Sequence, residues 1–177
     1  MSIFYEPRPI SVKTFVVLGM HRSATSLIAK SLDHEIHMGT RFIKPDEHNP
    51  LGYFENFSFY KLNMEILERA GGDWQNPPSE SEIMKQKSFF DFKIKQLIEQ
   101  SEKPLWGWKD PRTVLTINLF EPYLRNPHYI CCFRNPIEVA KSLVARNDMS
   151  FDKGIALAKE YNSRIIKFMS KKHEESW

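Results

Sequence analysis

Hydroxyl and basic side chains are concentrated in one short stretch of the chain, residues 19–26, which reads "GMHRSATS". This stretch follows an apolar run, residues 14–18, and leads into an amphipathic run. A strand that ends in glycine and turns into a helix directs backbone N–H groups and the positive end of the helix dipole at one point, which favours a bound phosphate or sulfate. Arg22 adds a planar charged fork, and Thr25 and Ser26 add hydroxyl donors. These residues predict an oxyanion-binding loop, although helix capping alone is a common role for such hydroxyls.

The loop differs from the one that binds nucleoside triphosphates, G-x-x-x-x-G-K-[ST]. Ala24 stands at the second glycine of that pattern and Thr25 at its lysine. Without the lysine and a clear carboxylate for Mg²⁺, hydrolysis of ATP or GTP is not expected. If the position of Ala24 requires a positive φ, alanine strains the backbone there.

A second group of polar residues follows another apolar run, residues 128–133. In the segment 134–142, "RNPIEVAKS", Arg134 comes just after the apolar run and Ser142 lies two turns into the next expected helix. Taken alone, a surface arginine and a helical serine usually have no special role. Taken with the first loop, they predict two anion sites at the carboxyl ends of neighbouring strands, where open α/β sheets bind their ligands.

Four segments of the chain resemble motifs of sulfotransferases that use 3′-phosphoadenosine 5′-phosphosulfate (PAPS), and they follow one another along the chain in the order in which that family has them. Residues 19–26 resemble the family's 5′-phosphosulfate loop, G-x-x-R-S-G-T-[ST], and residues 134–142 resemble its 3′-phosphate motif, in which a serine follows an arginine by eight positions. Residues 49–56, "NPLGYFEN", and 106–112, "WGWKDPR", resemble segments of bacterial and carbohydrate-type members. The likeness runs from about residue 14 to residue 146.

The resemblance implies a donor, PAPS, and an acceptor that carries a hydroxyl or an amine, either a small molecule or a carbohydrate. It places Arg22 where the family has the basic residue that stabilises the leaving phosphate. Two departures stand out: Ala24 replaces the usual glycine, and the chain ends at Trp177 where family members continue with further elements. The residues that the resemblance assigns to the donor are His21, Arg22, Ser23, Ala24, Thr25, Ser26, Arg134 and Ser142.

Transfer to a hydroxyl or amine also requires a base that removes the acceptor's proton. Glu55 is the first candidate, because the aromatic neighbours Tyr53, Phe54 and Phe57 can raise its pKa and line an acceptor site. A carboxylate that merely stabilises the start of a helix is the competing interpretation of Glu55. Asp110 is the second candidate for the base, although a structural ion pair with its basic neighbours is the simpler interpretation, and His21 is the third.

Apolar runs that alternate with amphipathic segments predict an α/β fold, namely a three-layer sandwich with a mainly parallel sheet and a P-loop-like phosphosulfate-binding loop. The 177 residues are interpreted as a single domain, 1–177. An ordered loop is expected over 41–56. The expected strands are 14–18, 104–108 and 128–133, and the expected helices are 25–32, 57–70, one from the Ser79/Glu82 capping pattern to about residue 98, Thr113 to Tyr123, one opened by Asn135, and 151–169.

Composition narrows the class of protein further. The chain is 41% hydrophobic and 13% aromatic, with a net charge of +3, which is typical of a folded domain with no general affinity for polyanions. We therefore expect no nucleic-acid partner and, in the absence of a long apolar run, no membrane span. Cys131 and Cys132 are adjacent and poorly placed to bridge each other, so a reduced, cytoplasmic protein is expected, and no residue pattern indicates a bound metal.

Two other classes of function remain open. One is a P-loop nucleotide kinase or related phosphotransferase, against which the missing lysine counts. The other is a catalytically silent domain that keeps a sulfotransferase-like fold for binding, which Ala24 and the short C-terminal part favour, whereas the intact set of Arg22, Arg134 and Ser142 counts against it.

Overall fold

Three parallel strands form the centre of the protein. The computed structural model describes residues 11–47, 49 and 52–174. The strands are β1 (Lys13–Gly19), β2 (Leu105–Lys109) and β3 (Pro127–Cys132), arranged in the order β2-β1-β3. Each lies within two residues of the run that the sequence predicts, because buried parallel strands are continuous apolar segments.

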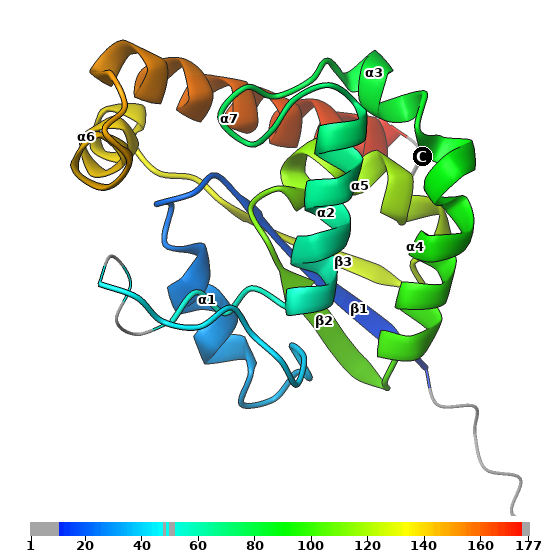
Figure 1. Ribbon diagram of the computed structural model, residues 1–177. Coiled ribbons are helices and arrows are strands. Elements are labelled where there is room, and N and C mark those ends of the chain that lie inside the picture. Colours follow the sequence, from blue (N-terminus) through cyan, green and yellow to red (C-terminus); the bar gives the residue numbers. More distant parts are fainter. Residues whose placement is uncertain (1–10, 48, 50–51, 175–177) are drawn as a thin grey trace, which may run out of the picture.

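The strands alternate with helices, as an α/β chain requires. α1 begins and ends at the residues expected from sequence, whereas the single helix expected after Ser79 is divided in two at Lys85 and Gln86. In chain order the helices are α1 (Thr25–Leu32), α2 (Phe57–Arg69), α3 (Glu80–Met84), α4 (Lys87–Ser101), α5 (Thr113–Phe120), the 3-10 turn η1 (Glu121–Tyr123), α6 (Pro136–Asn147) and α7 (Phe151–Glu174) (Figure 1).

Helices cover both faces of the sheet (Figure 1). Val16 and Leu18 of β1 point toward the core that α2, α4, α5 and α7 complete, whereas Val17 points toward Ala29 of α1 and toward Met38. The fold is therefore α/β with a three-stranded parallel sheet, an arrangement compatible with three layers. In α1, Ile28 and Leu32 pack on the same side as the buried Ala29, whereas Leu27 is 63% exposed.

Close pairing of β2 with β1 fixes what lies at the end of β2. A Cβ atom at Gly107 would lie 2.0 Å from the carbonyl oxygen of Phe15, so only glycine allows this approach. The register that follows sets Val17 beside Lys109. Lys109 is thereby held at the carboxyl edge of the sheet, next to the loop that follows β1.

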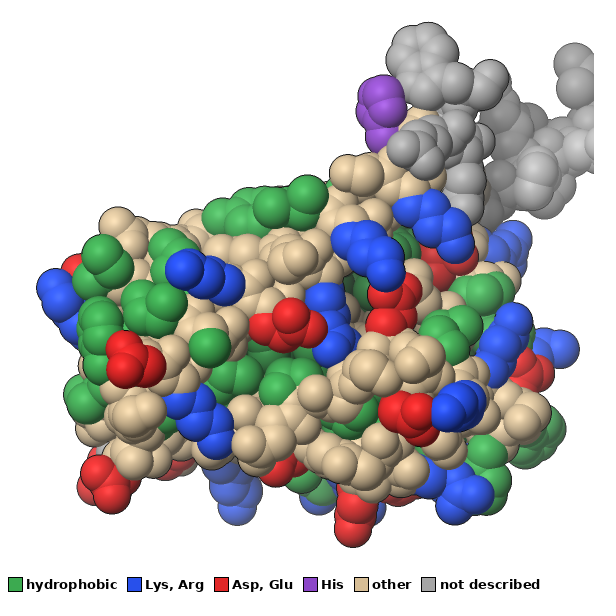
Figure 2. Space-filling view, turned by 90° about the horizontal axis from the view of Figure 1, so that it is seen from above, with side chains coloured by type: hydrophobic (Ala, Val, Ile, Leu, Met, Phe, Trp, Pro, Cys, Tyr) green, Lys and Arg blue, Asp and Glu red, His purple; other side chains and the backbone are tan. Residues whose placement is uncertain are grey.

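The outer surface seen from the side of α6 and α7 carries basic, acidic and hydrophobic side chains intermixed (Figure 2). Neighbouring groups also form ion pairs along α7, for example Arg164 with Glu160 at 2.7 Å. That face therefore presents no continuous basic field. In the part of the chain that the structure describes, no helix is both long and apolar enough to cross a membrane.

Candidate functional site

A cavity of about 260 Å³ lies at the carboxyl ends of the strands. Its walls come from the loop after β1, the start of α1, the segment before α2 and the end of β2. After β3, Arg134 and, in α6, Arg146 complete the wall. The walls are strongly positive, because the described lining carries one carboxylate, Glu55, against five cations. These cations are Arg22, Lys30, Lys109, Arg134 and Arg146.

The loop between β1 and α1 has an unusual backbone. Arg22 and Ala24 have φ values of 68° and 63°, with Ser23 between them outside the left-handed region. Such alternation gathers backbone N–H groups into a concave array that suits anions. Ala24 precedes α1 and cannot cap it with a side chain, and no described residue accepts a hydrogen bond from the backbone N–H of Thr25 or Ser26. The strain expected for alanine at this position is present, at about 1 kcal/mol.

The loop is in direct contact with the segment after β3. The Nε atom of Arg22 donates to Ser142 Oγ at 2.7 Å, and Nη1 of Arg134 donates to the carbonyl oxygen of Arg22 at 2.9 Å. The two motifs thus come together, as the sequence predicts. Their residues are not equivalent, however: Arg134 lines the cavity, whereas Ser142 is not among its lining residues and instead holds the guanidinium of Arg22.

Glu55 is held between two cations from the end of β2. Its Oε1 lies 3.2 Å from Lys109 Nζ, and its Oε2 lies 3.4 Å from Arg112 Nη1. The ammonium of Lys109 also donates to Ser26 Oγ at 3.3 Å, which ties the end of β2 to the start of α1. Glu55 comes before the N-cap residue Asn56, and its carboxylate makes these ion pairs rather than a contact with the helix end.

Burial opposes charge on these groups. Glu55 and Lys109 are 4% and 1% exposed. Burial raises the pKa of Glu55 above its ordinary value, although Lys109 and Arg112 counteract the rise. Burial likewise lowers the pKa of Lys109, although Glu55 and Asp110 oppose the change. The carboxylate and the ammonium are therefore each more ready to change protonation than they would be in water.

Asp110 is buried behind the cavity wall, next to Arg112. It is fully buried, pairs with Arg112 Nη1 at 2.7 Å and accepts a hydrogen bond from Asn63 Nδ2 at 2.7 Å. It is not among the residues that line the cavity. This geometry matches the structural ion pair rather than the base that the sequence also allowed.

The same network includes Thr113, the first residue of α5, which follows the N-cap position Arg112. Its hydroxyl oxygen accepts from Trp108 Nε1 and from Asn63 Nδ2, both at 3.0 Å. Because this buried hydroxyl oxygen already accepts two hydrogen bonds within the core, its role is structural.

His21 lies at the cavity wall and is almost wholly buried. Its ring packs on Trp74 with centroids 4.4 Å apart, and its Nε2 has no hydrogen-bond partner among the described residues. Burial holds the pKa of His21 well below its ordinary value, and the nearby cations, Arg112 first among them, lower it further. The imidazole is therefore neutral at pH 7.

The segment before α2 supplies an aromatic wall. Tyr53, Phe54 and Glu55 all line the cavity, and the carbonyl oxygen of Tyr53 accepts a hydrogen bond from Ser26 Oγ at 3.0 Å. Burial and the hydrogen bond to Asp46 raise the pKa of Tyr53 to about 12. Phe57, also expected at the site, does not line the cavity. Residues 50 and 51 of the motif "NPLGYFEN" lie outside the described residues.

Lys109 is the residue whose importance the sequence did not reveal. The sequence indicates only an ion-pair neighbour of Asp110, yet Lys109 reaches Ser26 at the start of α1 and pairs with Glu55. Arg146 and Lys30 were also missed as lining residues. A lysine directly after a buried strand was the available signal, since strand ends meet at this edge of the sheet.

The described residues contain no group of three or more His, Cys, Asp or Glu side chains that could hold a metal ion. Cys131 and Cys132 are free thiols, half-buried in β3. Comparison of the chain with models of protein families, with curated proteins and with solved structures finds no match.

His21 generates a test of this electrostatic environment. Its pKa is depressed in the folded state, so as the pH falls the unfolded chain takes up the proton first and stability is lost near the ordinary value of about 6.5. Between about pH 7.5 and about pH 5.5, the wild type should lose about 1 kcal/mol more of its free energy of unfolding than His21→Gln does. Urea unfolding of both proteins measures this difference. Equal losses would show that His21 is not held neutral.

Proposed function

We propose that the protein is a sulfotransferase that moves a sulfuryl group from PAPS to the hydroxyl or amine of a small-molecule or carbohydrate acceptor. The observation that carries this proposal is the cavity wall itself. It combines five cations, one buried carboxylate and a loop with two uncommitted backbone N–H groups at the carboxyl edge of a parallel sheet. Strand ends of this kind are where α/β proteins bind phosphorylated ligands.

The loop after β1 is proposed as a P-loop-like phosphosulfate-binding loop. The backbone N–H groups of Thr25 and Ser26 would receive the 5′-phosphosulfate, with Arg22 and Lys109 beside it. Arg134, which lines the same cavity and contacts the loop, would pair with the 3′-phosphate. The ammonium of Lys109 takes the part that the triphosphate-binding loop gives to its own lysine, but it comes from β2.

The volume of the cavity suggests how the donor is seated. Pockets that enclose a whole drug-sized ligand usually exceed about 300 Å³. The cavity of about 260 Å³ is smaller. It would therefore enclose the phosphosulfate end of PAPS and leave the adenine near its mouth.

The proposed reaction is a direct transfer. The acceptor oxygen or nitrogen attacks sulfur, the bond between sulfur and the bridging phosphate oxygen breaks, and PAP (3′-phosphoadenosine 5′-phosphate) leaves. Glu55 takes the proton that the acceptor loses, for which its raised pKa suits it. Charge that develops on the leaving phosphate is neutralised by Arg22 and Lys109, as transfer of such groups requires.

One observation also favours the phosphotransferase alternative. Lys109 provides an ammonium beside Ser26, so the lysine that the loop sequence lacks is present in space. The described lining residues include one carboxylate, Glu55, and this carboxylate is already paired with two cations. They offer no second carboxylate that could hold Mg²⁺. ATP with Mg²⁺ therefore belongs in the binding experiment.

The donor site predicts a preference between nucleotides. PAP should bind and raise the melting temperature more than ATP with Mg²⁺ does, because ATP lacks the 3′-phosphate that Arg134 is proposed to hold. Arg134→Ala should remove most of this preference, weakening PAP by about 2 kcal/mol through loss of a charge-assisted contact. Calorimetric titration measures both affinities.

The matched control is Lys141→Ala. It removes an exposed cation of the same segment, and this cation does not line the cavity. Equal affinity of the wild type for PAP and ATP would contradict the assignment of Arg134.

The base is tested by Glu55→Gln. Turnover with a true acceptor should fall roughly 10²–10⁴-fold, since the variant keeps the shape but cannot take the proton. PAP should still bind, because the two cations remain. The thermal stability of the free protein should fall, since Lys109 and Arg112 lose a buried counter-charge, and PAP should restore part of it.

Asp110→Asn serves as the control for the base. It alters the same charged cluster from a position outside the cavity, so it should reduce stability while turnover per folded molecule survives. Full turnover in Glu55→Gln together with lost turnover in Asp110→Asn would transfer the role of base to Asp110.

A further inference from the structure

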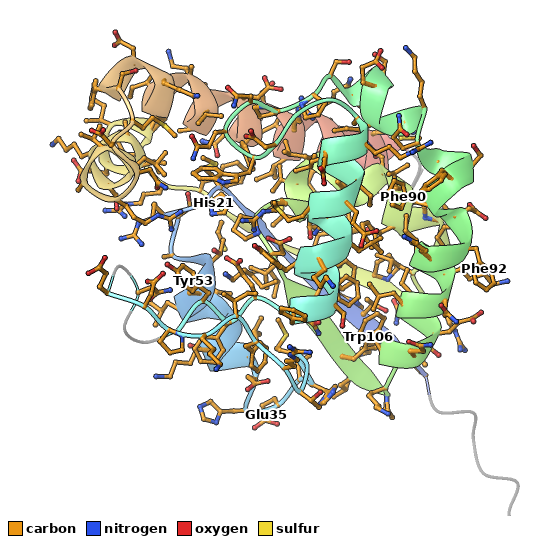
Figure 3. All side chains as sticks on the ribbon, in the orientation of Figure 1. His21, Glu35, Tyr53, Phe90, Phe92 and Trp106 are labelled. Atoms are coloured by element: carbon orange, nitrogen blue, oxygen red, sulfur yellow. The ribbon has the colours of Figure 1, made fainter. Side chains whose placement is uncertain are left out.

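A second cavity of about 250 Å³ opens beside β2, away from the site already described. It lies where the chain after α1, the start of α2 and the end of α4 meet the strand. Trp106, which lines it, is near the amino end of β2, whereas His21 and Tyr53 of the first cavity lie toward the opposite end of the sheet (Figure 3). No residue lines both cavities.

The described lining of this second cavity is polar and positive. It contains Arg41 and Lys103 and no carboxylate. Neither cation forms an ion pair with any described residue, in contrast to the paired lysines elsewhere on the surface. The guanidinium of Arg41 is held in place by the ring of Phe57, whose centroid lies 3.9 Å from Cζ. Two unpaired cations facing one hollow favour an anionic occupant.

Trp106 provides an independent indication of a ligand. Its side chain is 1% exposed, yet its Nε1 has no hydrogen-bond acceptor among the described residues. Trp108, two positions along the same strand, donates from its Nε1 to Thr113 Oγ1 at 3.0 Å. A buried donor without an acceptor is costly, so buried indoles usually have a partner. An acceptor supplied by a bound molecule would satisfy Trp106.

The amino end of α2 also favours a negatively charged occupant of this second cavity. Its N-cap residue Asn56 and its first-turn residue Ser58 line the cavity. The positive end of the helix dipole therefore faces the hollow and favours negative charge there.

We propose that this second cavity is a binding site for a small organic oxyanion, a molecule with a phosphate or carboxylate group. The group pairs with Arg41 and Lys103, and one acceptor oxygen of the ligand receives the hydrogen bond of Trp106 Nε1. The site is independent of the donor cavity and does not rest on the proposed transfer reaction.

Nuclear magnetic resonance of the tryptophan indole N–H groups tests the proposal on the full chain. Inorganic phosphate and citrate are titrated separately against sodium chloride of equal ionic strength. The Trp106 signal, assigned from its loss in Trp106→Phe, should shift saturably with at least one of the two anions. The Trp74 signal reports on the first cavity, because Trp74 packs on His21.

Four variants separate the sites. Two of them, Lys103→Ala and Arg41→Ala, should each weaken the anion affinity measured from the Trp106 signal at least about tenfold, because a charge-assisted contact is lost. The side chain of Lys103 is exposed. Lys95→Ala removes an exposed cation of α4 that lines neither cavity and should leave the affinity unchanged. Arg134→Ala should also leave it unchanged.

The outcomes decide the proposal. A saturable Trp106 shift with phosphate, with citrate or with both supports the site and identifies the preferred group. No shift with either anion, or an unchanged affinity in both Lys103→Ala and Arg41→Ala, overturns it. A Trp106 shift that disappears in Arg134→Ala also overturns it, because the signal would then report on the first cavity.

Discussion

Four buried charges, those of Glu55, Lys109, Asp110 and Arg112, constrain the rest of this structure. Each is costly to remove from water, and each becomes tolerable only through its neighbours: Lys109 and Arg112 share Glu55, and Arg112 also pairs with Asp110. The cluster joins the segment before α2 to the end of β2 and, through Ser26, to the start of α1. Segments far apart in the sequence are thereby fixed around one cavity.

The balance within this cluster also limits the positive charge at the cavity wall. Glu55 is the one carboxylate among the described lining residues. It pairs with Lys109, which lines the cavity, and with Arg112, which does not. An arriving phosphosulfate would take over this role, so Glu55 would be released from part of its pairing as the donor binds. The proposed base would thus become available when the substrate is present, which links donor binding to proton removal.

The sequence predicted the elements well where the signal is local and poorly where it depends on tertiary contacts. The bounds of α1 and the Asn135 cap of α6 follow from apolar period and capping chemistry, and both are confirmed. The reach of Lys109 to Ser26 depends on the register of β2 against β1, where Gly107 packs closely on Phe15. The contact of Arg22 with Ser142 depends on the pairing of β3 with β1, and no local sequence pattern encodes either register. The exposure of Leu27 has a similar cause, since it lies at the cavity and not on the sheet.

We propose that the cluster around Lys109 receives an oxyanion, and the stability of the protein in different anions is the most informative measurement. The free energy of unfolding is measured for the wild type and for Lys109→Met in sodium sulfate and in sodium chloride of equal ionic strength. Sulfate should stabilise the wild type selectively, by about 2.7 kcal/mol at 100 times its dissociation constant, and Lys109→Met should lose most of this gain. An equal effect of the two salts on the wild type, or a full sulfate effect in Lys109→Met, would contradict it.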